Sequence, residues 1–135
     1  MRKRELRQFI ILVADSHLNT RNIIENALTK RGYRVLSCSS AADVVGFLEE
    51  NDIDIVIADI KILNDSGLDL VEYVRTNFKV VVIMLVDGCD SFEGPANALK
   101  IGVNEYLIKP FTNKELTVSV RRAIEKLVYV RSSYR

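Results

Sequence analysis

Short apolar runs alternate with longer amphipathic segments along almost the whole chain, and this alternation limits the folds that it can adopt. The runs predict five strands, at Phe9–Ala14, Tyr33–Ser37, Asp54–Ala58, Val80–Val86 and Glu105–Ile108. The runs FIILVA and VVVIMLV are apolar at consecutive positions, which is typical of strands buried on both faces. Strands that alternate with helices form a parallel sheet with helices on both sides, because each crossover returns the chain to the same edge.

The segments between the runs carry helix signals. In the first, one face is expected to be buried and consists of Ile23, Ile24, Ala27 and Leu28. Ser40 can cap the second helix, and a third is expected from about Gly67. Proline suits the first helical position, so a late, short fourth helix is predicted at Pro95–Ile101. The last helix opens with a capping box at Thr112–Glu115. Its predicted buried residues are Leu116, Val120, Ala123, Ile124 and Leu127.

Length and charge exclude several classes of protein. A chain of 135 residues is one ordinary domain. A net charge of +1 implies no direct binding to nucleic acid or to an anionic membrane. No apolar run approaches the length of a membrane span, and no cleavage site follows residues 9–14, so we expect a cytoplasmic protein without a signal peptide. Cys38 and Cys89 are expected to be reduced thiols.

Charged residues follow four of the five predicted strands. Asp15 comes after the first strand, Asp59 after the third, Asp87 after the fourth and Lys109 after the fifth. An acidic residue at a strand end is most often a turn or cap residue, but the carboxyl ends of parallel strands meet at one edge, where such folds place their functional crevice. Carboxylates beside one lysine suit Mg²⁺ together with a phosphate, because Mg²⁺ prefers one or two carboxylates and several waters.

Three segments of the sequence resemble the receiver domains of bacterial two-component response regulators. They are ILVAD-SHLNTR, DIVIAD-IKILNDSGLDLVEYVR and NEYLIKPFTNKEL, and the resemblance extends from about Phe9 to Val128. It implies a flavodoxin-like, doubly wound sheet of five parallel strands in the order 2-1-3-4-5. It also implies a basic extension at residues 1–8, a receiver domain at 9–130, and a tail at 131–135 that could begin a linker to an effector domain.

The resemblance assigns a role to each residue at the strand ends. Asp59 would accept a phosphoryl group from a sensor histidine kinase or a phosphotransfer protein. Asp15, Asp59 and the main-chain carbonyl of Lys61 would hold Mg²⁺. Lys109 would pair with a phosphoryl oxygen, and Tyr106 would change rotamer on activation. The Lys109–Pro110 bond is expected to be cis. The surface that switches, and through which a homodimer could form, would comprise the fourth helix, the fifth strand and the fifth helix.

Three residues depart from the family pattern. Ser16 replaces the second residue of an acidic pair, which weakens the expected Mg²⁺ site. Leu63 stands where a proline is usual. Asp87 replaces a threonine or serine whose hydroxyl meets the phosphoryl group. Two unit charges about 4 Å apart repel by roughly 4 kcal/mol at an effective dielectric constant near 20, so an ionised Asp87 would oppose phosphorylation unless it is neutralised.

Two interpretations of Asp87 remain open from the sequence. It could replace Ser16 as a ligand of the metal, which would leave a working phosphoacceptor. It could instead pair with Lys109 and supply a permanent charge, which would make a pseudo-receiver that binds proteins without phosphorylation. At most, the protein would catalyse its own phosphotransfer and dephosphorylation. A flavin- or nucleotide-binding protein is disfavoured, because the loop at residues 15–20 has no glycine. His17 is expected to be a surface residue.

Overall fold

The computed structural model describes residues 8–64, 70–87 and 102–132. Its strands are β1 (Ile10–Ala14), β2 (Arg34–Cys38), β3 (Ile55–Asp59), β4 (Val81–Asp87) and β5 (Glu105–Lys109). Its helices are α1 (Leu18–Thr29), α2 (Ala41–Glu50), α3 (Ile60–Leu63), α4 (Leu70–Asn77) and α6 (Asn113–Ser132). The strands form one parallel sheet in the order β2-β1-β3-β4-β5, which confirms the predicted topology.

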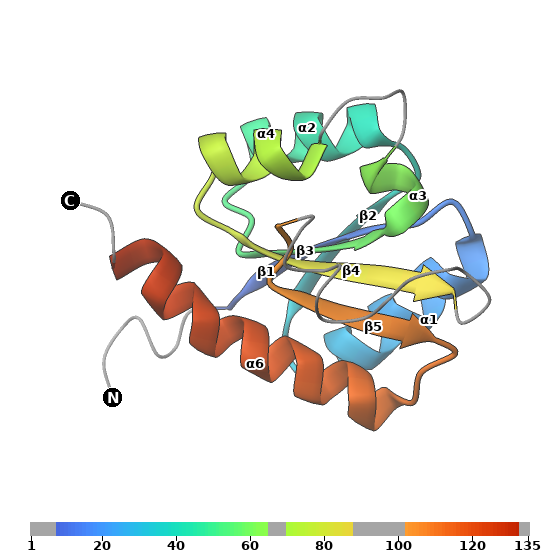
Figure 1. Ribbon diagram of the computed structural model, residues 1–135. Coiled ribbons are helices and arrows are strands. Elements are labelled where there is room, and N and C mark those ends of the chain that lie inside the picture. The colour runs from blue at the N-terminus through green and yellow to red at the C-terminus, as the bar shows by residue number, and fades with distance from the viewer. Residues whose placement is uncertain (1–7, 65–69, 88–101, 133–135) are drawn as a thin grey trace.

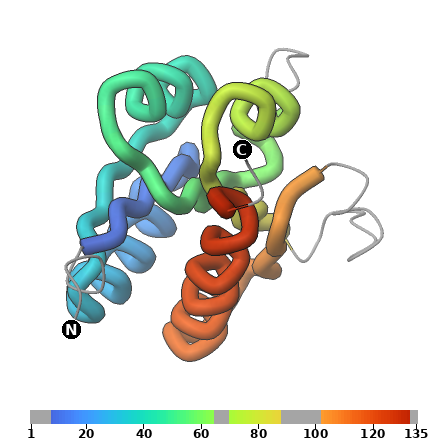
Figure 2. Tube along the Cα trace, turned by 90° about the vertical axis from the view of Figure 1, so that its left-hand side faces the viewer, coloured from blue at the N-terminus to red at the C-terminus, as the bar shows by residue number. Residues whose placement is uncertain are grey.

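Helices cover both faces of this sheet. Figure 1 shows α2, α3 and α4 on one side and α1 and α6 on the other, and Figure 2 shows the same two layers after a quarter turn. Alternate side chains of β3 therefore enter different hydrophobic clusters: Val56 packs on the α2 and α4 side, and Ile57 on the α1 and α6 side. Every residue of β3 is buried, as the consecutive apolar run predicted.

The helix signals were largely correct. Ser40 Oγ accepts a hydrogen bond from the Asp43 amide at 3.2 Å, as expected for a cap. The capping box is also confirmed, since the Glu115 amide donates to Thr112 Oγ1 at 3.0 Å and the Thr112 amide donates to Glu115 Oε1 at 2.9 Å. The Lys109–Pro110 bond is cis, as predicted.

One predicted core position was wrong. Ile23 is 55% exposed, because the side of α1 that meets the sheet is centred on Ile24 and Leu28. Ala27 and Ile124 are half-buried and pack against the hydrophobic cluster on the α1 and α6 side, while Leu116, Val120, Ala123 and Leu127 are buried as expected.

The segment directly after β3 forms a helix that the sequence patterns did not predict. Residues 60–63 form the short helix α3, which Asp59 caps and which buries Ile62 and Leu63. The expected helix start near Gly67 and the predicted helix at Pro95–Ile101 lie outside the described residues, as does Cys89. Cys38 is a free, buried cysteine, and burial raises the pKa of its thiol to about 11.

An ion pair between a buried aspartate and an exposed arginine closes the amino edge of the sheet. Asp54, just before β3, is fully buried, and its Oδ2 accepts a hydrogen bond from the Ile10 amide at 2.8 Å. Arg131, in the last turn of α6, places a guanidinium nitrogen 2.9 Å from Asp54 Oδ1 and donates from Nε to the Lys79 carbonyl at 3.2 Å. The end of α6 is thus fixed to the start of β3. No described helix has the length and apolar character required to cross a membrane.

Candidate functional site at the carboxyl edge of the sheet

The fold brings all four predicted strand-end residues to one edge. Asp15 directly follows β1, whereas Asp59, Asp87 and Lys109 are the last residues of β3, β4 and β5. The register pairs Asp59 with Leu85 and Asp87 with Lys109. Because the sheet is parallel, these four side chains start from the same end of adjacent strands. The central spatial prediction from the sequence is therefore confirmed.

Lys109 joins the two most buried carboxylates. Its Nζ lies 2.7 Å from Asp15 Oδ2 and 2.7 Å from Asp59 Oδ2. The side chain of Asp15 is fully buried, that of Asp59 is 5% exposed and that of Lys109 is 14% exposed. Bonds from an ammonium to carboxylates in such a dry environment are stronger than bonds between neutral groups. The three groups form a compact charged cluster, which we call the Asp–Lys–Asp cluster.

The second oxygen of each carboxylate binds a backbone amide. Asp15 Oδ1 accepts a bond from the His17 amide at 2.8 Å, and Asp59 Oδ1 accepts one from the Lys61 amide at 2.7 Å. These bonds form because each aspartate ends a strand just before a helical turn, where amides lack helical partners. Both carboxylates are therefore held in fixed orientations by the main chain.

Burial and bonding act in opposite directions on the charges of the cluster. Burial raises the pKa of Asp15, but the bonds from Lys109 and His17 outweigh it and leave the pKa below the usual 3.8. Burial lowers the pKa of Lys109, but its bonds to Asp15 and Asp59 outweigh that effect and leave the pKa above 10.5. Asp15 and Lys109 are thus both charged at neutral pH.

Asp87 has a cationic partner that the sequence reasoning did not identify. Its Oδ2 lies 3.8 Å from Nζ of Lys61, with the two side chains 45% and 63% exposed. The ammonium of Lys109, to which the pseudo-receiver interpretation assigned Asp87, is turned to Asp15 and Asp59 instead. The sequence held one signal of this pair, a lysine two residues after Asp59. Lys61 lies in the short helix α3, and from there its side chain reaches the end of β4.

The remaining predicted residues lie around the cluster. Ser16 is exposed, and Tyr106 is half-buried against the hydrophobic cluster on the α2 and α4 side. His17 is exposed, as expected, but its Nδ1 lies 3.2 Å from Asp15 Oδ1, so it touches the site. Arg21 of α1 donates to the Asp15 carbonyl at 2.6 Å. These two contacts were missed because sequence spacing does not show which side chains fold back onto a strand end.

The donor set suits a hard cation such as Mg²⁺ in type. Two fixed carboxylates match the one or two that Mg²⁺ prefers, with water completing its shell. Within residues 8–64, 70–87 and 102–132, no group of three or more histidine, cysteine, aspartate or glutamate side chains is positioned to hold a metal ion. Because residue 16 is a serine where the family pattern has an acidic residue, the Asp–Lys–Asp cluster offers a metal only the carboxylates of Asp15 and Asp59.

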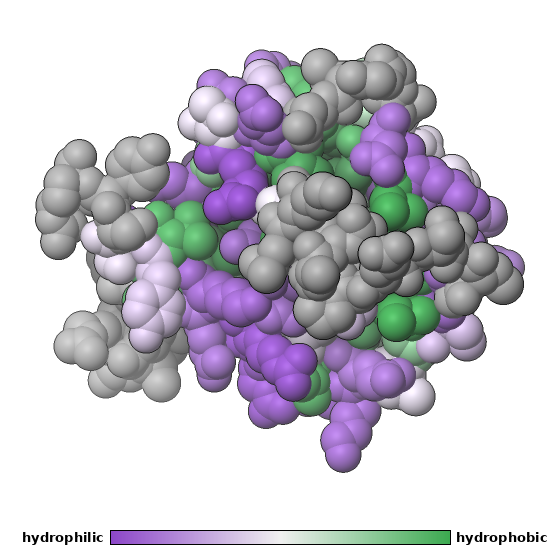
Figure 3. All heavy atoms as spheres, viewed as in Figure 1, coloured by the Kyte–Doolittle hydropathy of each residue, from purple (hydrophilic) through white to green (hydrophobic). Residues whose placement is uncertain are grey.

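An apolar pocket adjoins the cluster. It has a volume of about 320 Å³ and is lined by Thr20, Ile23, Asp87, Lys109, Pro110 and Phe111. Figure 3 shows hydrophobic residues at the surface near the carboxyl end of β5. A larger pocket of about 910 Å³ lies at the amino edge, beside Arg131, and none of the clustered charges lines it. The smaller pocket, unlike the larger one, is lined by a member of the Asp–Lys–Asp cluster, Lys109.

The comparisons with known proteins agree with this geometry. A family model for the response regulator receiver domain matches residues 11–121. The aerobic respiration control protein ArcA of Escherichia coli strain K12 is 32% identical over 116 residues, which are 86% of this chain and 48% of ArcA. The chain thus spans about half the length of that relative.

Solved structures support the same assignment. A response regulator receiver domain protein from Clostridium thermocellum is 33% identical with a TM-score of 0.73, and the match covers 87% of this chain and 95% of that one. The chemotaxis response regulator CheY4 of Vibrio cholerae shares the fold, with a TM-score of 0.76 at 22% identity over 87% of this chain and 99% of its own. This chain belongs to the response regulator receiver domain family of two-component signalling systems.

Proposed function

We propose that this receiver domain accepts a phosphoryl group on Asp59 from a sensor histidine kinase or a phosphotransfer protein. The observation that carries the proposal is the pair of 2.7 Å bonds from Lys109 to Asp59 and Asp15. They fix a nearly buried carboxylate at an open edge of the sheet, next to a cation that can bind a phosphoryl oxygen. A structural ion pair would need only one of the two aspartates.

The chemistry consists mainly of positioning and charge neutralisation. An Asp59 oxygen attacks phosphorus, an acyl phosphate bond forms, and the bond from phosphorus to the donor's imidazole nitrogen breaks. The released nitrogen keeps the bonding electron pair and takes a proton from solvent. Attack by a carboxylate oxygen needs no base, because a carboxylate has no proton to remove. Lys109 then follows the added charge from the carboxylate oxygen to a phosphoryl oxygen.

Asp15, Asp59 and the main-chain carbonyl of Lys61 are the proposed Mg²⁺ ligands, with Asp87 as the alternative to the lost acidic residue at Ser16. When bound, the ion supplies positive charge to the phosphoryl oxygens. The domain's own contribution is to keep Asp15 charged and oriented, through the amide of His17 and the ammonium of Lys109.

The phosphodonor is proposed to dock on the apolar surface beside the site. Leu18 and Ile23 on the outer face of α1 are 60% and 55% exposed, and Ile23 lines the pocket with Pro110 and Phe111. An exposed apolar rim around a charged centre is typical of a protein-binding surface. The misprediction of Ile23 as a core residue is thus explained by a proposed role in docking.

Phosphorylation is proposed to change a second surface, composed of the predicted helix at Pro95–Ile101, β5 and α6. Tyr106 is the proposed rotamer switch, since it lies on β5 three residues before Lys109. The same surface is proposed for homodimerisation. We further propose that the domain acts in the cytoplasm, binds neither DNA nor membranes itself, and passes its signal through residues 131–135 to an effector.

The phosphoacceptor proposal is tested by intact mass. The wild type, incubated with Mg²⁺ and acetyl phosphate, should gain the mass of one phosphoryl group, and Asp59→Asn should gain none. Asp54→Asn tests another buried aspartate, and it should still be labelled. A wild type that stays unlabelled while a standard receiver domain is labelled would refute the proposal. An adduct that persists in Asp59→Asn would place the site elsewhere.

A phosphorylation-independent interaction module is the second candidate. It is favoured by two observations at the acidic edge: Ser16 offers only an exposed hydroxyl, and Asp87 puts a charge where the family has a neutral side chain. This function predicts partner binding that is unchanged by Asp59→Asn but altered by Asp87→Thr. A large loss of binding in Asp59→Asn alone would exclude it.

A further inference from the structure

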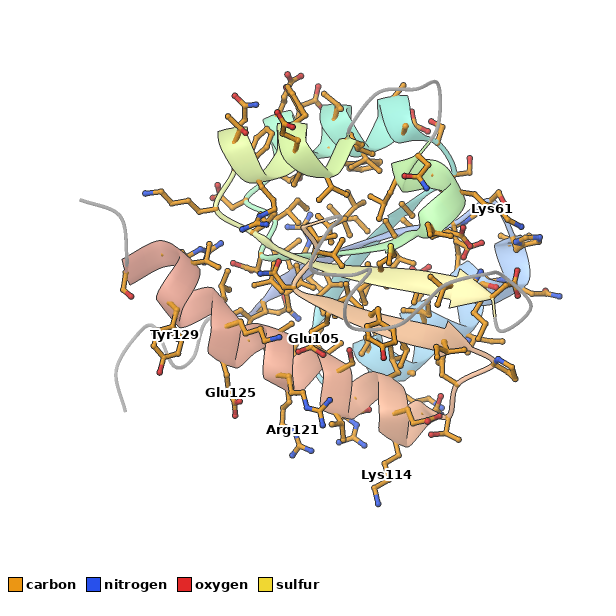
Figure 4. The ribbon with its side chains drawn as sticks, viewed as in Figure 1. Lys61, Glu105, Lys114, Arg121, Glu125 and Tyr129 are labelled. Atoms are coloured by element: carbon orange, nitrogen blue, oxygen red, sulfur yellow. The ribbon has the colours of Figure 1, made fainter. Side chains whose placement is uncertain are left out.

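The ion pair between Lys61 and Asp87 places a second cation at the carboxyl edge. Lys61 Nζ lies 3.8 Å from Asp87 Oδ2, and both side chains are partly exposed. Figure 4 labels Lys61 at the end of the molecule toward which the arrows of β4 and β5 point. The pair is therefore at the open mouth of the site, whereas the Asp–Lys–Asp cluster is its buried floor.

The main chain fixes Lys61 beside the acceptor. Its amide donates to Asp59 Oδ1 at 2.7 Å, so its Cα cannot move away while Asp59 keeps that bond. Its side chain spans from there to Asp87 at the end of the neighbouring strand β4. A group added to an oxygen of Asp59 would consequently come close to both members of the pair.

The charges at this edge show what the pair does. Asp15, Asp59 and Asp87 are three acidic groups, and Lys109 donates to the first two. Lys61 supplies positive charge at the third. A phosphoryl group brings nearly two further negative charges, and the ammonium of Lys61 reduces the repulsion between these charges and the Asp87 carboxylate.

We propose that Lys61 is a positioning residue, which neutralises Asp87 and so makes phosphorylation of Asp59 compatible with an acidic residue at position 87. The inference rests on the proposed phosphoacceptor function. It assigns the side chain of Lys61 a task distinct from that of its main-chain carbonyl, namely to reduce the repulsion that Asp87 creates. Lys61 and Asp87 form one functional unit: either residue alone would be unfavourable.

A double-mutant cycle tests this unit. The rates of phosphorylation by acetyl phosphate are measured by intact mass for the wild type, Lys61→Met, Asp87→Thr and the double variant. For a partly exposed pair, Lys61→Met should slow labelling about fivefold in the wild-type background and less than about twofold in the Asp87→Thr background. Lys61→Arg should restore most of the rate, because it keeps the charge. Lys30→Met, an exposed lysine at the end of α1, is the matched control and should not change it.

The outcomes separate this inference from the function on which it rests. Equal slowing by Lys61→Met in both backgrounds, or no slowing in either, would overturn the role of the pair while leaving a labelled wild type and hence the phosphoacceptor. Labelling of Asp87→Thr but not of the wild type would show that Lys61 fails to neutralise Asp87, and would overturn it as well. If neither protein is labelled, the phosphoacceptor function fails and the inference fails with it. Thermal melts of all variants exclude unfolding as the cause.

Discussion

The two edges of the sheet both bury an aspartate against a cation from the last third of the chain, but in different proportions. At the amino edge, one carboxylate, Asp54, faces the guanidinium of Arg131 and accepts a backbone amide. At the carboxyl edge, two carboxylates, Asp15 and Asp59, share the single ammonium of Lys109. Among the described residues, the first arrangement is balanced in charge, whereas the second has one more negative than positive charge.

This difference predicts that the amino-edge pair contributes mainly to stability, whereas the carboxyl-edge cluster is suited to the proposed phosphoryl transfer. At the amino edge, the loss of Arg131 would leave a buried carboxylate uncompensated, and the loss of Asp54 would leave a backbone amide without its acceptor. A site with more acidic groups than cations stores repulsion, and such excess is common at functional sites. The two edges should therefore respond oppositely to the loss of an aspartate.

The largest effect is expected at the amino edge. Asp54→Ala leaves the Ile10 amide without its acceptor and removes the carboxylate that faces Arg131, so it should reduce the free energy of unfolding by about 3 kcal/mol. Urea unfolding measures it. The exposed neighbour Asp52→Ala serves as the control, with a change within about 0.5 kcal/mol. A loss for Asp54→Ala as small as that of the control would show that the pair is not structural.

The cation of the carboxyl edge comes next. Lys109→Met leaves two carboxylates facing each other and should reduce stability by about 2 kcal/mol at neutral pH. Lys30→Met, on the exposed surface, should have no such effect. Equal stabilities of the two variants would argue that the cluster carries no net energy.

The pH dependence of the same variant sharpens the comparison. Because the folded pKa of Asp15 is depressed, its contribution is present above the usual 3.8 and is lost as the pH falls through the folded value. The raised pKa of Lys109 makes its contribution present below 10.5 and lost as the pH rises through the folded value. Acid unfolding followed by circular dichroism should therefore occur at higher pH in Lys109→Met than in the wild type. Coincident acid curves would contradict the assigned bonds.

A smaller effect is expected where α6 begins, near the carboxyl edge. Thr112→Ala removes one half of the capping box and should cost about 1 kcal/mol. Lys114→Ala, in the same turn, is the control. Arg131 binds the buried Asp54 carboxylate, so the end of α6 is expected to contribute more to stability than its start. A loss of stability in Thr112→Ala as large as that in Asp54→Ala would contradict this.

The smallest effect is expected at the proposed acceptor, Asp59. Asp59→Asn keeps an acceptor for the Lys61 amide and relieves repulsion with Asp15, so the free energy of unfolding should stay within about 1 kcal/mol of the wild type or exceed it. Urea unfolding at neutral pH provides the measurement. A loss similar to that of Asp54→Ala would place Asp59 with the structural residues.

Much of this fold could be predicted from the sequence, because consecutive apolar residues and helix caps are local signals. Residues 80–86 were predicted as a strand, and β4 occupies Val81–Asp87. The meeting of Asp15, Asp59, Asp87 and Lys109 followed from the strand ends, since a parallel sheet leaves one edge for all of them.

The rest depended on side-chain directions that a linear pattern does not contain. Helical periodicity grouped Ile23 with Ile24, yet only the contact with the sheet determines which of the two is buried. Asp54 and Arg131 are 77 positions apart in the sequence, and no local pattern around either residue indicates that the two side chains pair. Likewise, the family resemblance assigned a role to the carbonyl of Lys61, but its position two residues after Asp59 did not by itself indicate that its ammonium pairs with Asp87.

The shared ammonium of Lys109 also makes the ends of β1 and β3 thermodynamically linked. Lys109 donates to both carboxylates, so a change of charge on one of them changes how strongly the ammonium binds the other. By reciprocity, a ligand that strengthens the bond of Lys109 to one carboxylate binds more tightly, to the same extent, when that bond is already strong. Substitutions of residues that contact Asp15, such as His17 and Arg21, are thus expected to change the lifetime of the proposed phosphoryl group on Asp59, although these residues lie outside β3.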